Sequence, residues 1–270
     1  MKIVVTGGTG TVGCHVIKHY LNKCKGIEAW CFSRDEFKQF HMQTEIEDPR
    51  LFFAIGDVRD AESVDAVCEG ADLIVHAAAL KHVATGENYP MEVVKTNILG
   101  TKNVVNAANK YGAKMVLVST DKAVQPENLY GATKKIAEHL TLTGGQRVVR
   151  FGNIFGSRGS VLHIFNEWCE RGHTFKITDK RMTRFIAKAE DVGKYIQSAL
   201  AGDAGSIYIP ELKAMRIIDL AYAFDADATI EEIGLFPGEK IAESLEVGRS
   251  SEDAELYTID EIKGLIRETL

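Results

Sequence analysis

The chain has 270 residues, of which 45% are apolar, 26% charged and 8% aromatic, and its formal net charge is −6. This length and composition fit one large globular domain, or a nucleotide-binding domain with a smaller companion, and they exclude intrinsic disorder. The mild acidity, without a basic stripe, excludes a typical nucleic-acid binder, and no stretch reaches the ~18 consecutive apolar residues of a membrane span. Because no signal-like leader is present, we expect a cytoplasmic protein with no membrane partner.

Strand-like and helix-like segments alternate from the first residue. Strands are predicted at Lys2–Thr6, Ile27–Phe32, Leu51–Ile55, Leu73–Ala77, Lys114–Ser119 and Arg147–Phe151. Helices are predicted between them at Val12–Leu21, Ala61–Cys68, Met91–Lys110 and Tyr130–Leu142. Such alternation requires right-handed crossovers, so it predicts an α/β fold with a doubly wound, Rossmann-like parallel sheet, whose ligand binds at the carboxyl ends of the strands.

The pattern loosens after residue 155. A turn at Gly156–Gly159, a helix at Val161–Arg171 and a short strand at Phe175–Thr178 are predicted, and a mixture of short strands and loops runs from Ile207 to Lys240. A helix at Ala189–Ala201 is expected to return to the main sheet. We therefore expect residues 1–155 to bind a dinucleotide, residues 156–270 to form a smaller C-terminal substrate-binding domain, and residues 185–205 to return to the first domain.

A glycine-rich loop joins the first strand to the first helix and contains GxGxxG. Glycines there permit positive φ and let the backbone approach a pyrophosphate, while the helix N-terminus supplies amide donors. A tight structural turn would not need three glycines at this spacing. The loop residues expected to contact a dinucleotide are Gly7, Thr9, Gly10, Thr11, Val12 and Gly13.

The second strand is followed by Ser33 and Arg34, where an acidic residue would bind the ribose 2′-hydroxyl of NAD. A hydroxyl and a guanidinium suit a 2′-phosphate instead, so NADP is favoured over NAD. The alternative is that Arg34 lies on the surface and Asp35 binds the ribose. Asp57 and Val58 are placed to flank the adenine, although Asp57 could also simply cap the next turn.

Tyr130 and Lys134 lie four residues apart, on one face of a predicted helix. A phenol with a pKa of ~10 is a poor base at neutral pH, but a neighbouring ammonium and a positive nicotinamide ring would lower that pKa. Such a pair could accept a hydroxyl proton while a cofactor takes the hydride. Tyr-x-x-x-Lys is common by chance, and its place after the fifth strand of a dinucleotide fold makes it informative.

Further ordered motifs carry a family resemblance. They are the runs 32–36, 55–60, 76–83 (HAAALKHV), 119–123 (STDKA), 128–134 (NLYGATK), 156–161, 177–179, 182–185 and 237–240 (PGEK), together with Asn153. Over residues 2–245 the chain resembles the UDP-N-acetylglucosamine 4,6-dehydratase (inverting) family of the extended short-chain dehydrogenase/reductase superfamily.

The resemblance implies a three-stage reaction on a UDP-sugar. Tyr130 would take the C4 hydroxyl proton as C4 passes a hydride to NADP⁺, Lys122 would remove the C5 proton, and Asp121 would protonate the leaving C6 hydroxyl. The hydride then returns to C6. The resemblance also implies that Thr120 helps hold the reacting groups, that Lys81 lies near cofactor and sugar, and that Asn153 contacts either at the domain junction. It further places Ala77 and Ala78 at the cofactor.

Substrate contacts are implied at Arg158, Arg184 and Lys240, whose cations would bind the uridine diphosphate, with Ser160 and Thr178 as further nucleotide contacts. The alternative for each cation is a surface ion pair. Family members that retain the C5 configuration tend to carry Met at the position of Tyr130, so the tyrosine indicates the inverting type. This chain departs from the family pattern in two places: the connection at 141–146 and the segment after Lys240 are both shorter than is usual in the family. A homo-oligomer is expected, and both shortened segments could alter its subunit contacts.

Two other functions stay open: a UDP-sugar 4-epimerase, which would not need Asp121 and Lys122, and a non-catalytic NADP-binding protein. Neither the histidines nor the five scattered cysteines are spaced as ligands, so no metal is expected. His76 is expected to be a buried core residue. For Asn97, a role beside the catalytic helix and a purely structural hydrogen bond are equally open.

Overall fold

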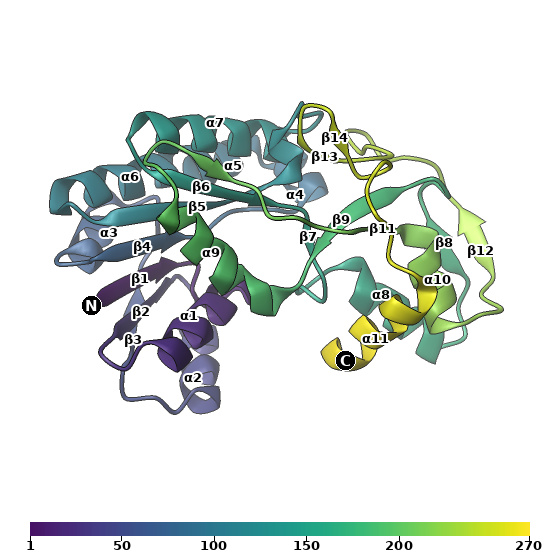
Figure 1. The fold of residues 1–270 in the computed structure, drawn as a ribbon, viewed down its shortest axis with the longest axis horizontal. Coiled ribbons are helices and arrows are strands. Elements are labelled where there is room, and N and C mark those ends of the chain that lie inside the picture. Colours follow the sequence, from purple (N-terminus) through teal and green to yellow (C-terminus); the bar gives the residue numbers. More distant parts are fainter.

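The computed structural model describes residues 1–270 and shows a large lobe and a smaller one (Figure 1). The large lobe is built on a parallel sheet of seven strands, in the order β10-β6-β5-β4-β1-β2-β3. These strands are β1 (Lys2–Thr6), β2 (Glu28–Ser33), β3 (Leu51–Ile55), β4 (Leu73–His76), β5 (Lys114–Thr120), β6 (Arg147–Phe151) and β10 (Ile207–Tyr208). The predicted doubly wound parallel sheet is confirmed.

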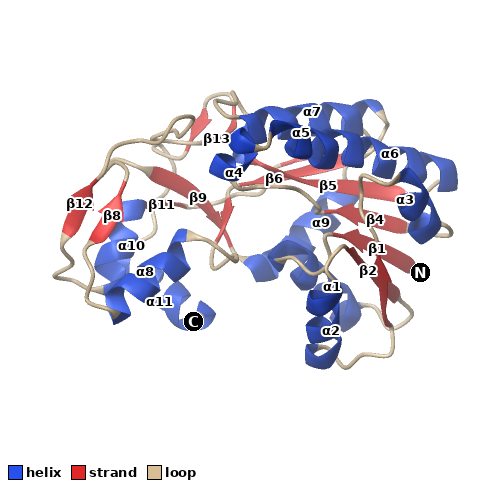
Figure 2. Ribbon diagram, turned by 180° about the vertical axis from the view of Figure 1, so that it is seen from behind, coloured by secondary structure: helices blue, strands red, loops and turns tan.

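Helices cover both faces of this sheet (Figures 1 and 2). One face carries α1 (Thr11–Lys23), α2 (Glu36–Glu45) and α9 (Val192–Ala201), and the other α3 (Ala61–Cys68), α6 (Gly100–Tyr111) and α7 (Leu129–Thr143). Successive strand residues point to opposite faces, so Ile3 and Val5 pack beneath α1 while Val4 packs in the core beneath α3 and α6. Both faces are therefore apolar, as the nearly continuous hydrophobic runs predict.

The strand order reverses beside β1, because β2 lies on one side of it and β4 on the other. At such a reversal the loops that leave neighbouring strands run to opposite faces, and a crevice opens at their carboxyl ends. The glycine-rich loop after β1 and residues 77–82 after β4 both leave the sheet at this point. The crevice is where we look for a ligand site.

The smaller lobe contains two short sheets and three helices around its own apolar core. One sheet joins β7 (Asn153–Ile154), β9 (Thr183–Ala187) and β11 (Ala214–Arg216), and the other joins β8 (Phe175–Ile177) and β12 (Ile230–Glu232). The helices are α8 (Val161–Glu170), α10 (Ile217–Phe224) and α11 (Ile259–Thr269). None of the helices in the structure combines the length and apolar composition needed to cross a bilayer.

The chain crosses between the lobes several times. After β9 it returns to the large lobe, where α9 packs against α1 and β6, and β10 pairs with β6. A later hairpin of β13 (Ser244–Glu246) and β14 (Arg249–Ser250) lies beside the short 3₁₀ turn η2 (Asp121–Ala123) that follows β5 (Figure 1). Residues near 240 are thereby brought to the end of β5.

Several elements differ from the prediction. Helices α2, α4 (Val83–Asn88), α10 and α11 were not predicted, and the segment from Ile207 to Lys240, expected to hold only strands and loops, contains α10. That helix has only eight residues, all of them apolar except Asp219, and a short apolar run does not distinguish a helix from a strand. In α2 only Gln39 and Met42 are buried, while Phe37 and Phe40 are exposed. The apolar residues of α2 therefore do not form the single buried face by which an amphipathic helix is recognised in a sequence.

The long helix predicted at Met91–Lys110 is not uniform. It consists of α5 (Pro90–Val93), a π-helical turn η1 (Val94–Leu99) and α6. Such π-turns are frequent at functional sites because the wider turn redirects side chains. Here the turn carries Asn97, which is buried and exchanges hydrogen bonds with the backbone N–H and carbonyl of Leu80, at 2.8 and 3.0 Å.

Candidate active site

The glycine-rich loop is shaped for close approach. Gly7 has φ +66°, and a Cβ there would lie 2.9 Å from the backbone of Ala78, while a Cβ at Gly13 would lie 2.5 Å from the Gly7 carbonyl oxygen. The first helical hydrogen bond of α1 runs from Cys14 N–H to the Gly10 carbonyl, at 2.9 Å. The N–H groups of Thr11, Val12 and Gly13 have no acceptor in the protein, which fits a pyrophosphate.

Two cations lie against this loop. The guanidinium of Arg158 donates to the Thr9 carbonyl, and its backbone N–H donates to Thr11 Oγ1 at 3.3 Å. Lys81 Nζ donates to the Arg158 carbonyl at 3.1 Å, and burial, followed by the charge of Arg158, lowers the pKa of Lys81. Sequence analysis placed Arg158 on the substrate diphosphate, whereas the structure places it on the glycine-rich loop.

At the other end of the crevice, Asp35 is the N-cap of α2. It accepts a hydrogen bond from Lys38 N–H at 3.0 Å and pairs with Lys38 Nζ at 2.8 Å. Asp57 accepts hydrogen bonds from Arg59 N–H and Nε at 2.9 and 2.8 Å, so it does cap its own turn. Arg34 lies half exposed with its guanidinium 3.7 Å from Asp57. Of the charged groups expected near the ribose, Arg34 therefore has the weakest contacts within the protein.

The remaining predicted cofactor contacts lie along the same crevice. Ser33 ends β2, and its hydroxyl accepts a hydrogen bond from Gln39 at 3.0 Å. Val58 is buried, and a Cβ on Gly100 would lie 2.8 Å from its Cγ2. Ala77 and Ala78 follow β4, where His76 is fully buried between the hydroxyls of Thr6 and Thr101, at 2.6 and 3.0 Å. His76 is thus a core residue, as expected.

The predicted acid and base lie together where β5 ends. Asp121 is fully buried, and its Oδ1 accepts hydrogen bonds from Thr120 Oγ1 at 2.9 Å and from Lys122 Nζ at 3.0 Å. Lys122 Nζ also donates to Asn153 Oδ1 at 3.0 Å. Asn153 begins β7, so the structure brings this junction residue to Lys122, and its expected contact with cofactor or substrate stays a prediction.

Lys122 carries its charge in this arrangement. Burial alone would lower its pKa, but the negative charges of Asp121 and Glu243 outweigh burial and raise the pKa above its usual value. Asp121 Oδ2 is buried and has no hydrogen-bond partner in the protein. An unpaired buried carboxylate oxygen is costly, so this atom is well suited to meet a substrate hydroxyl.

Tyr130 and Lys134 differ from the expectation. Burial raises the pKa of Tyr130 to about 12, and of its neighbours only the charge of Lys122 and the Thr120 hydroxyl act to lower it. Lys134 Nζ donates instead to the Val118 carbonyl at 2.7 Å, and burial lowers the pKa of Lys134 to about 8. The expected lowering of the tyrosine pKa by Lys134 is therefore not found in the chain alone.

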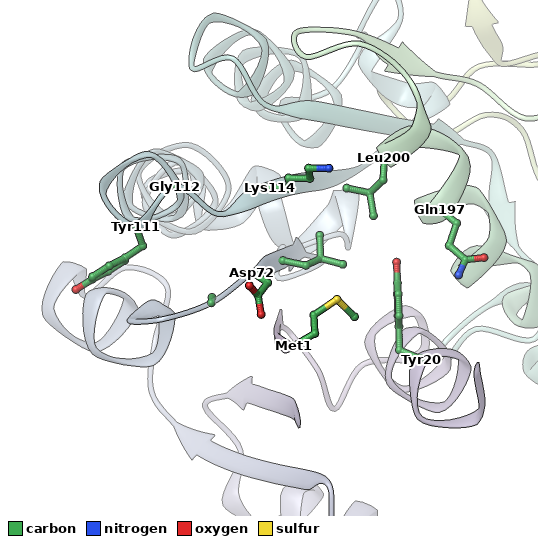
Figure 3. Close-up of a pocket in the computed structure, with 10 residues that line it drawn as sticks. Met1, Tyr20, Asp72, Tyr111, Gly112, Lys114, Gln197 and Leu200 are labelled. Carbon is green, nitrogen blue, oxygen red and sulfur yellow. The ribbon is translucent and has the colours of Figure 1, made fainter. Parts of the chain in front are cut away.

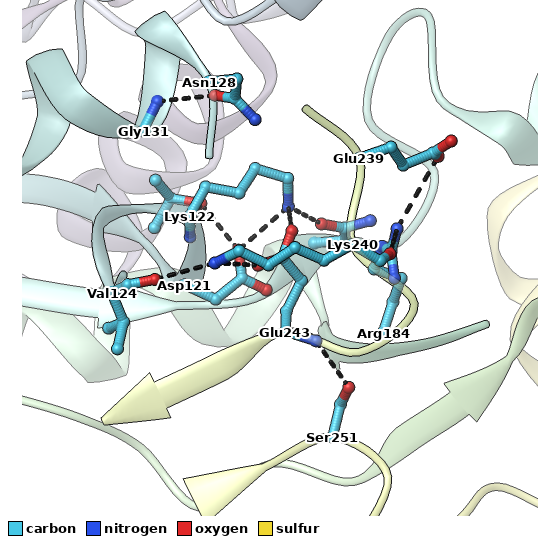
Figure 4. A network of polar contacts seen from close by, with 12 residues as sticks. Asp121, Lys122, Val124, Asn128, Gly131, Arg184, Glu239, Lys240, Glu243 and Ser251 are labelled. Atoms are coloured by element: carbon cyan, nitrogen blue, oxygen red, sulfur yellow. Dashed lines mark hydrogen bonds and ion pairs between the residues drawn. The ribbon is translucent and has the colours of Figure 1, made fainter. Parts of the chain in front are cut away.

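The first turn of α7 is positioned by its cap. Asn128 Oδ1 accepts a hydrogen bond from Gly131 N–H at 2.8 Å (Figure 4). Asn128 Nδ2 donates to the Gly238 carbonyl at 2.9 Å. A side chain at Gly131 would overlap the Lys122 carbonyl oxygen. Farther along α7, Thr133 Oγ1 accepts a hydrogen bond from Asn97 Nδ2 at 3.0 Å. Asn97 thus ties residues 77–82 to α7.

Arg184 and Lys240 hold the segment 237–243 over the site. Arg184 donates to the carbonyls of Thr183, Lys240 and Ile241 at 2.7, 2.8 and 2.9 Å. Lys240 Nζ donates to the Val124 carbonyl at 2.9 Å. Sequence analysis placed both cations on a diphosphate, but here their polar groups contact the protein's own carbonyls.

Ser160 and Thr178 lie in the smaller lobe, beside elements other than the turn η2 that carries Asp121 and Lys122. Ser160 is the residue before α8, and its buried hydroxyl has no partner. Thr178 follows β8, and its hydroxyl contacts Met182 Sδ at 3.5 Å. Neither hydrogen-bonds to another predicted site residue.

Sequence analysis missed Glu243. Its buried carboxylate lies 3.5 Å from Lys122 Nζ and 3.6 Å from Lys240 Nζ. Glu243 directly precedes the short strand β13, and an acidic residue in such a position is normally expected on the surface, so the sequence does not predict its burial. Its place three residues after the PGEK run was the one available signal.

A hollow of about 640 Å³ lies at the opposite end of the sheet (Figure 3). It is lined by residues at the amino ends of β1, β4 and β5, including Met1, Leu73 and Lys114. None of the predicted site residues lines it. Ligands of doubly wound sheets bind at the carboxyl ends of the strands, so the crevice and not this hollow is the candidate active site.

Known proteins with similar sequences carry related names. A family model described as "Polysaccharide biosynthesis protein" matches residues 3–263. A Campylobacter jejuni protein named UDP-N-acetylglucosamine 4,6-dehydratase (inverting) is 41% identical over 94% of this chain and 79% of its own length. A Rickettsia conorii protein named UDP-glucose 4-epimerase is 40% identical over 90% of this chain and 76% of its own.

Solved structures have the same fold. The X-ray structure of Pen from Bacillus thuringiensis matches with a TM-score of 0.92 and 29% identity, over 99% of this chain and 97% of its own. DesIV, a dTDP-glucose 4,6-dehydratase from Streptomyces venezuelae, matches in fold with a TM-score of 0.82 at 21% identity, over 99% of this chain and 96% of its own. The chain belongs to the polysaccharide biosynthesis protein family, with the extended short-chain dehydrogenase/reductase fold, and its predicted resemblance to the inverting UDP-N-acetylglucosamine 4,6-dehydratases is confirmed.

Proposed function

We propose that the protein is an NADP-dependent 4,6-dehydratase that acts on UDP-N-acetylglucosamine and inverts C5. The observation that carries the proposal is the hydrogen-bonded pair of Asp121 and Lys122 at the carboxyl end of β5, beside Tyr130. An acid and a base in contact are what the removal of water across two adjacent carbons requires. The name of the Campylobacter jejuni relative supports the same reaction.

The site residues then divide the proton transfers. Bound NADP⁺ would accept a hydride from C4, its reduced form would return that hydride to C6, and its positive charge would favour the phenolate of Tyr130. Tyr130 Oη takes the C4 hydroxyl proton, and the resulting ketone makes the C5 proton acidic. The proton of the Asp121–Lys122 hydrogen bond moves from Nζ to Oδ1, which leaves a neutral amine and a carboxylic acid. Lys122 takes the C5 proton, and Asp121 protonates the C6 hydroxyl, which departs as water. When the hydride returns to C6, C5 takes a proton from solvent on the face opposite to Lys122, which inverts C5, and Tyr130 releases its proton to solvent.

The other residues bind and position. We assign the glycine-rich loop, Lys81 and Arg158 to the cofactor pyrophosphate, because the loop has free N–H groups and Arg158 and Lys81 bring two positive charges next to it. Arg34 would bind the 2′-phosphate, since Asp35 already serves as a helix cap. Residues 1–155 with the returning 185–205 would form the cofactor domain, and residues 156–270 the substrate domain, with Ser160 and Thr178 as nucleotide contacts.

A mass measurement tests the reaction. Incubation with UDP-N-acetylglucosamine and NADP⁺ should give a product lighter by one water, with the cofactor unchanged at the end. A product of unchanged mass with altered C4 configuration would show a 4-epimerase, which the name of the Rickettsia conorii relative favours as the second candidate. Tight NADP binding with no turnover of any UDP-sugar would support a non-catalytic protein.

One substitution separates the two enzymes. Lys122→Ala removes the proposed C5 base and should lower dehydration about 100-fold or more, whereas an epimerase would not need this amine. Lys135→Ala, on the exposed face of α7, is the matched control and should act as the unsubstituted protein does. Full activity of Lys122→Ala would exclude the dehydratase assignment.

A further inference from the structure

Glu243 extends the catalytic pair. We propose that Glu243 is a positioning residue: it is the counter-ion that holds the amine of Lys122 between Asp121 and Asn153 and stabilises the ammonium formed when Lys122 takes a proton from substrate. This inference rests on the proposed dehydratase function. Glu243 lies outside the sequence motifs that indicate the reaction, and the mechanism proposed above does not use its carboxylate.

The carboxylate bridges two amines. Oε1 lies 3.5 Å from Lys122 Nζ, and Oε2 lies 3.6 Å from Lys240 Nζ (Figure 4). Glu243 is only 3% exposed, and Oε2 has no hydrogen-bond partner. A buried carboxylate is costly unless a charge compensates it, so its location between two ammonium groups is a strong electrostatic constraint on both.

The backbone around Glu243 is fixed from the sheet of the smaller lobe. Its N–H donates to Ser251 Oγ at 3.0 Å, and its carbonyl accepts from Ser251 N–H at 2.8 Å. The hydroxyls of Ser251 and Thr183, in β9, are 2.8 Å apart. These hydrogen bonds fix the position of the Glu243 backbone, and a fixed backbone helps its side chain keep one geometry relative to Lys122.

A second tie comes from the large lobe. Arg150 donates to the carbonyl of Leu245, in β13, at 2.9 Å, and forms a buried ion pair with Glu138 of α7 at 2.6 Å. The segment that carries Glu243 is therefore joined to the helix that carries Tyr130. The backbone of this segment is therefore held from both lobes.

Four charged or titratable groups face Lys122: Asp121 from its own turn, Glu243, Arg184 from β9 and Tyr130 from α7. In the proposed mechanism, Asp121 is an anion and Lys122 an ammonium once water has left. Glu243 supplies the second negative charge of that state. Without it, the positive charge of Arg184 is less balanced, and the amine becomes a weaker base.

The test compares Glu243→Gln with Glu246→Gln. Glu246 lies three residues after Glu243, in β13, and its side chain is half exposed. Glu246→Gln therefore removes one negative charge, as Glu243→Gln does, but from a position in contact with solvent. The readouts are kcat and KM for UDP-N-acetylglucosamine from about pH 7 to about 11.5, a range that includes the alkaline fall expected from the raised pKa of Lys122. Above the pKa of Lys122 the shared proton is lost and Asp121 has none to give, so activity must fall there.

For Glu243→Gln we expect kcat to fall about tenfold or more, KM to change less than about twofold, and the alkaline fall of kcat to move to lower pH by about 1 unit or more. Glu246→Gln should match the unsubstituted protein. A Glu243→Gln protein with the original kcat and pH profile would overturn the inference. So would a loss of kcat without displacement of the alkaline limb, because a merely structural role predicts that result.

Glu243→Asp guards against misfolding of the first variant. It keeps the charge but shortens the side chain, so kcat should fall while the alkaline limb stays in its original place; a displaced limb would contradict the charge role. The unsubstituted protein reports on the proposed function separately. If it forms no dehydrated product, the dehydratase assignment fails, whatever the variants do.

Discussion

The Lys122 carbonyl oxygen occupies the space that a side chain at residue 131 would need, so only glycine fits at Gly131. This contact packs the turn that carries the proposed base against the first turn of α7, which carries Tyr130. The two proton-transfer groups are therefore set relative to each other by a backbone contact. The pattern Tyr-Gly-x-x-Lys owes its glycine to this packing rather than to chemistry.

Gly131→Ala should impair catalysis because the new methyl group pushes η2 away from α7. We expect kcat to fall about tenfold or more, and the free energy of unfolding to fall by about 1–3 kcal/mol. Gly264→Ala is the control: that glycine lies within α11, with open space around it. It should keep full activity and gain up to about 1 kcal/mol of stability. Unchanged kcat in Gly131→Ala would show that the contact does not position the site.

Cofactor choice should depend on Arg34. Arg34→Ala removes the guanidinium proposed to bind the 2′-phosphate, so fluorescence titration should show NADP binding weakened about tenfold or more, and NAD binding changed less than about twofold. Lys38→Ala removes a half-exposed cation from the neighbouring turn and should change neither affinity. An equal loss for both dinucleotides, or no loss for either, would contradict the assignment.

Stability should fall in mild acid because of His76. Burial lowers the pKa of His76 to about 3, so between pH 6.5 and 3 the unfolded chain binds a proton that the folded chain does not. Stability is therefore complete above pH 6.5 and decreases as the pH falls below it, by about 1.4 kcal/mol per unit. Urea unfolding at pH 6.5 and pH 5 should differ by about 2 kcal/mol from this residue.

His19 supplies the control, because burial also lowers its pKa. The carboxyl groups with lowered pKa, among them Asp48, Asp179 and Glu261, lose their contribution to stability only at lower pH, outside this window. The acid loss should persist in His19→Gln and shrink in His76→Gln. If His76→Gln leaves the loss intact, the buried histidine is not its source.

The sheet and the paired site residues were predictable because they depend on local pattern. Alternating apolar runs identify the strands, and the glycine loop and Asp121-Lys122 each occupy adjacent positions in the chain. The contacts that join distant segments were not predictable. Glu243 reaches Lys122 through a hairpin more than a hundred residues away, and Arg158 turns toward the Thr9 carbonyl. The expected homo-oligomer and the effect of the short connection at 141–146 stay predictions.

The most direct test of the Asp121–Lys122 account is the reaction in deuterated water, followed by NMR at C5. If Lys122 removes the C5 proton, UDP-N-acetylglucosamine should yield a 4-keto-6-deoxy sugar that carries deuterium at C5 and has the L-arabino configuration. Recovered substrate, or a 6-deoxy product that keeps its original hydrogen at C5, would contradict the account.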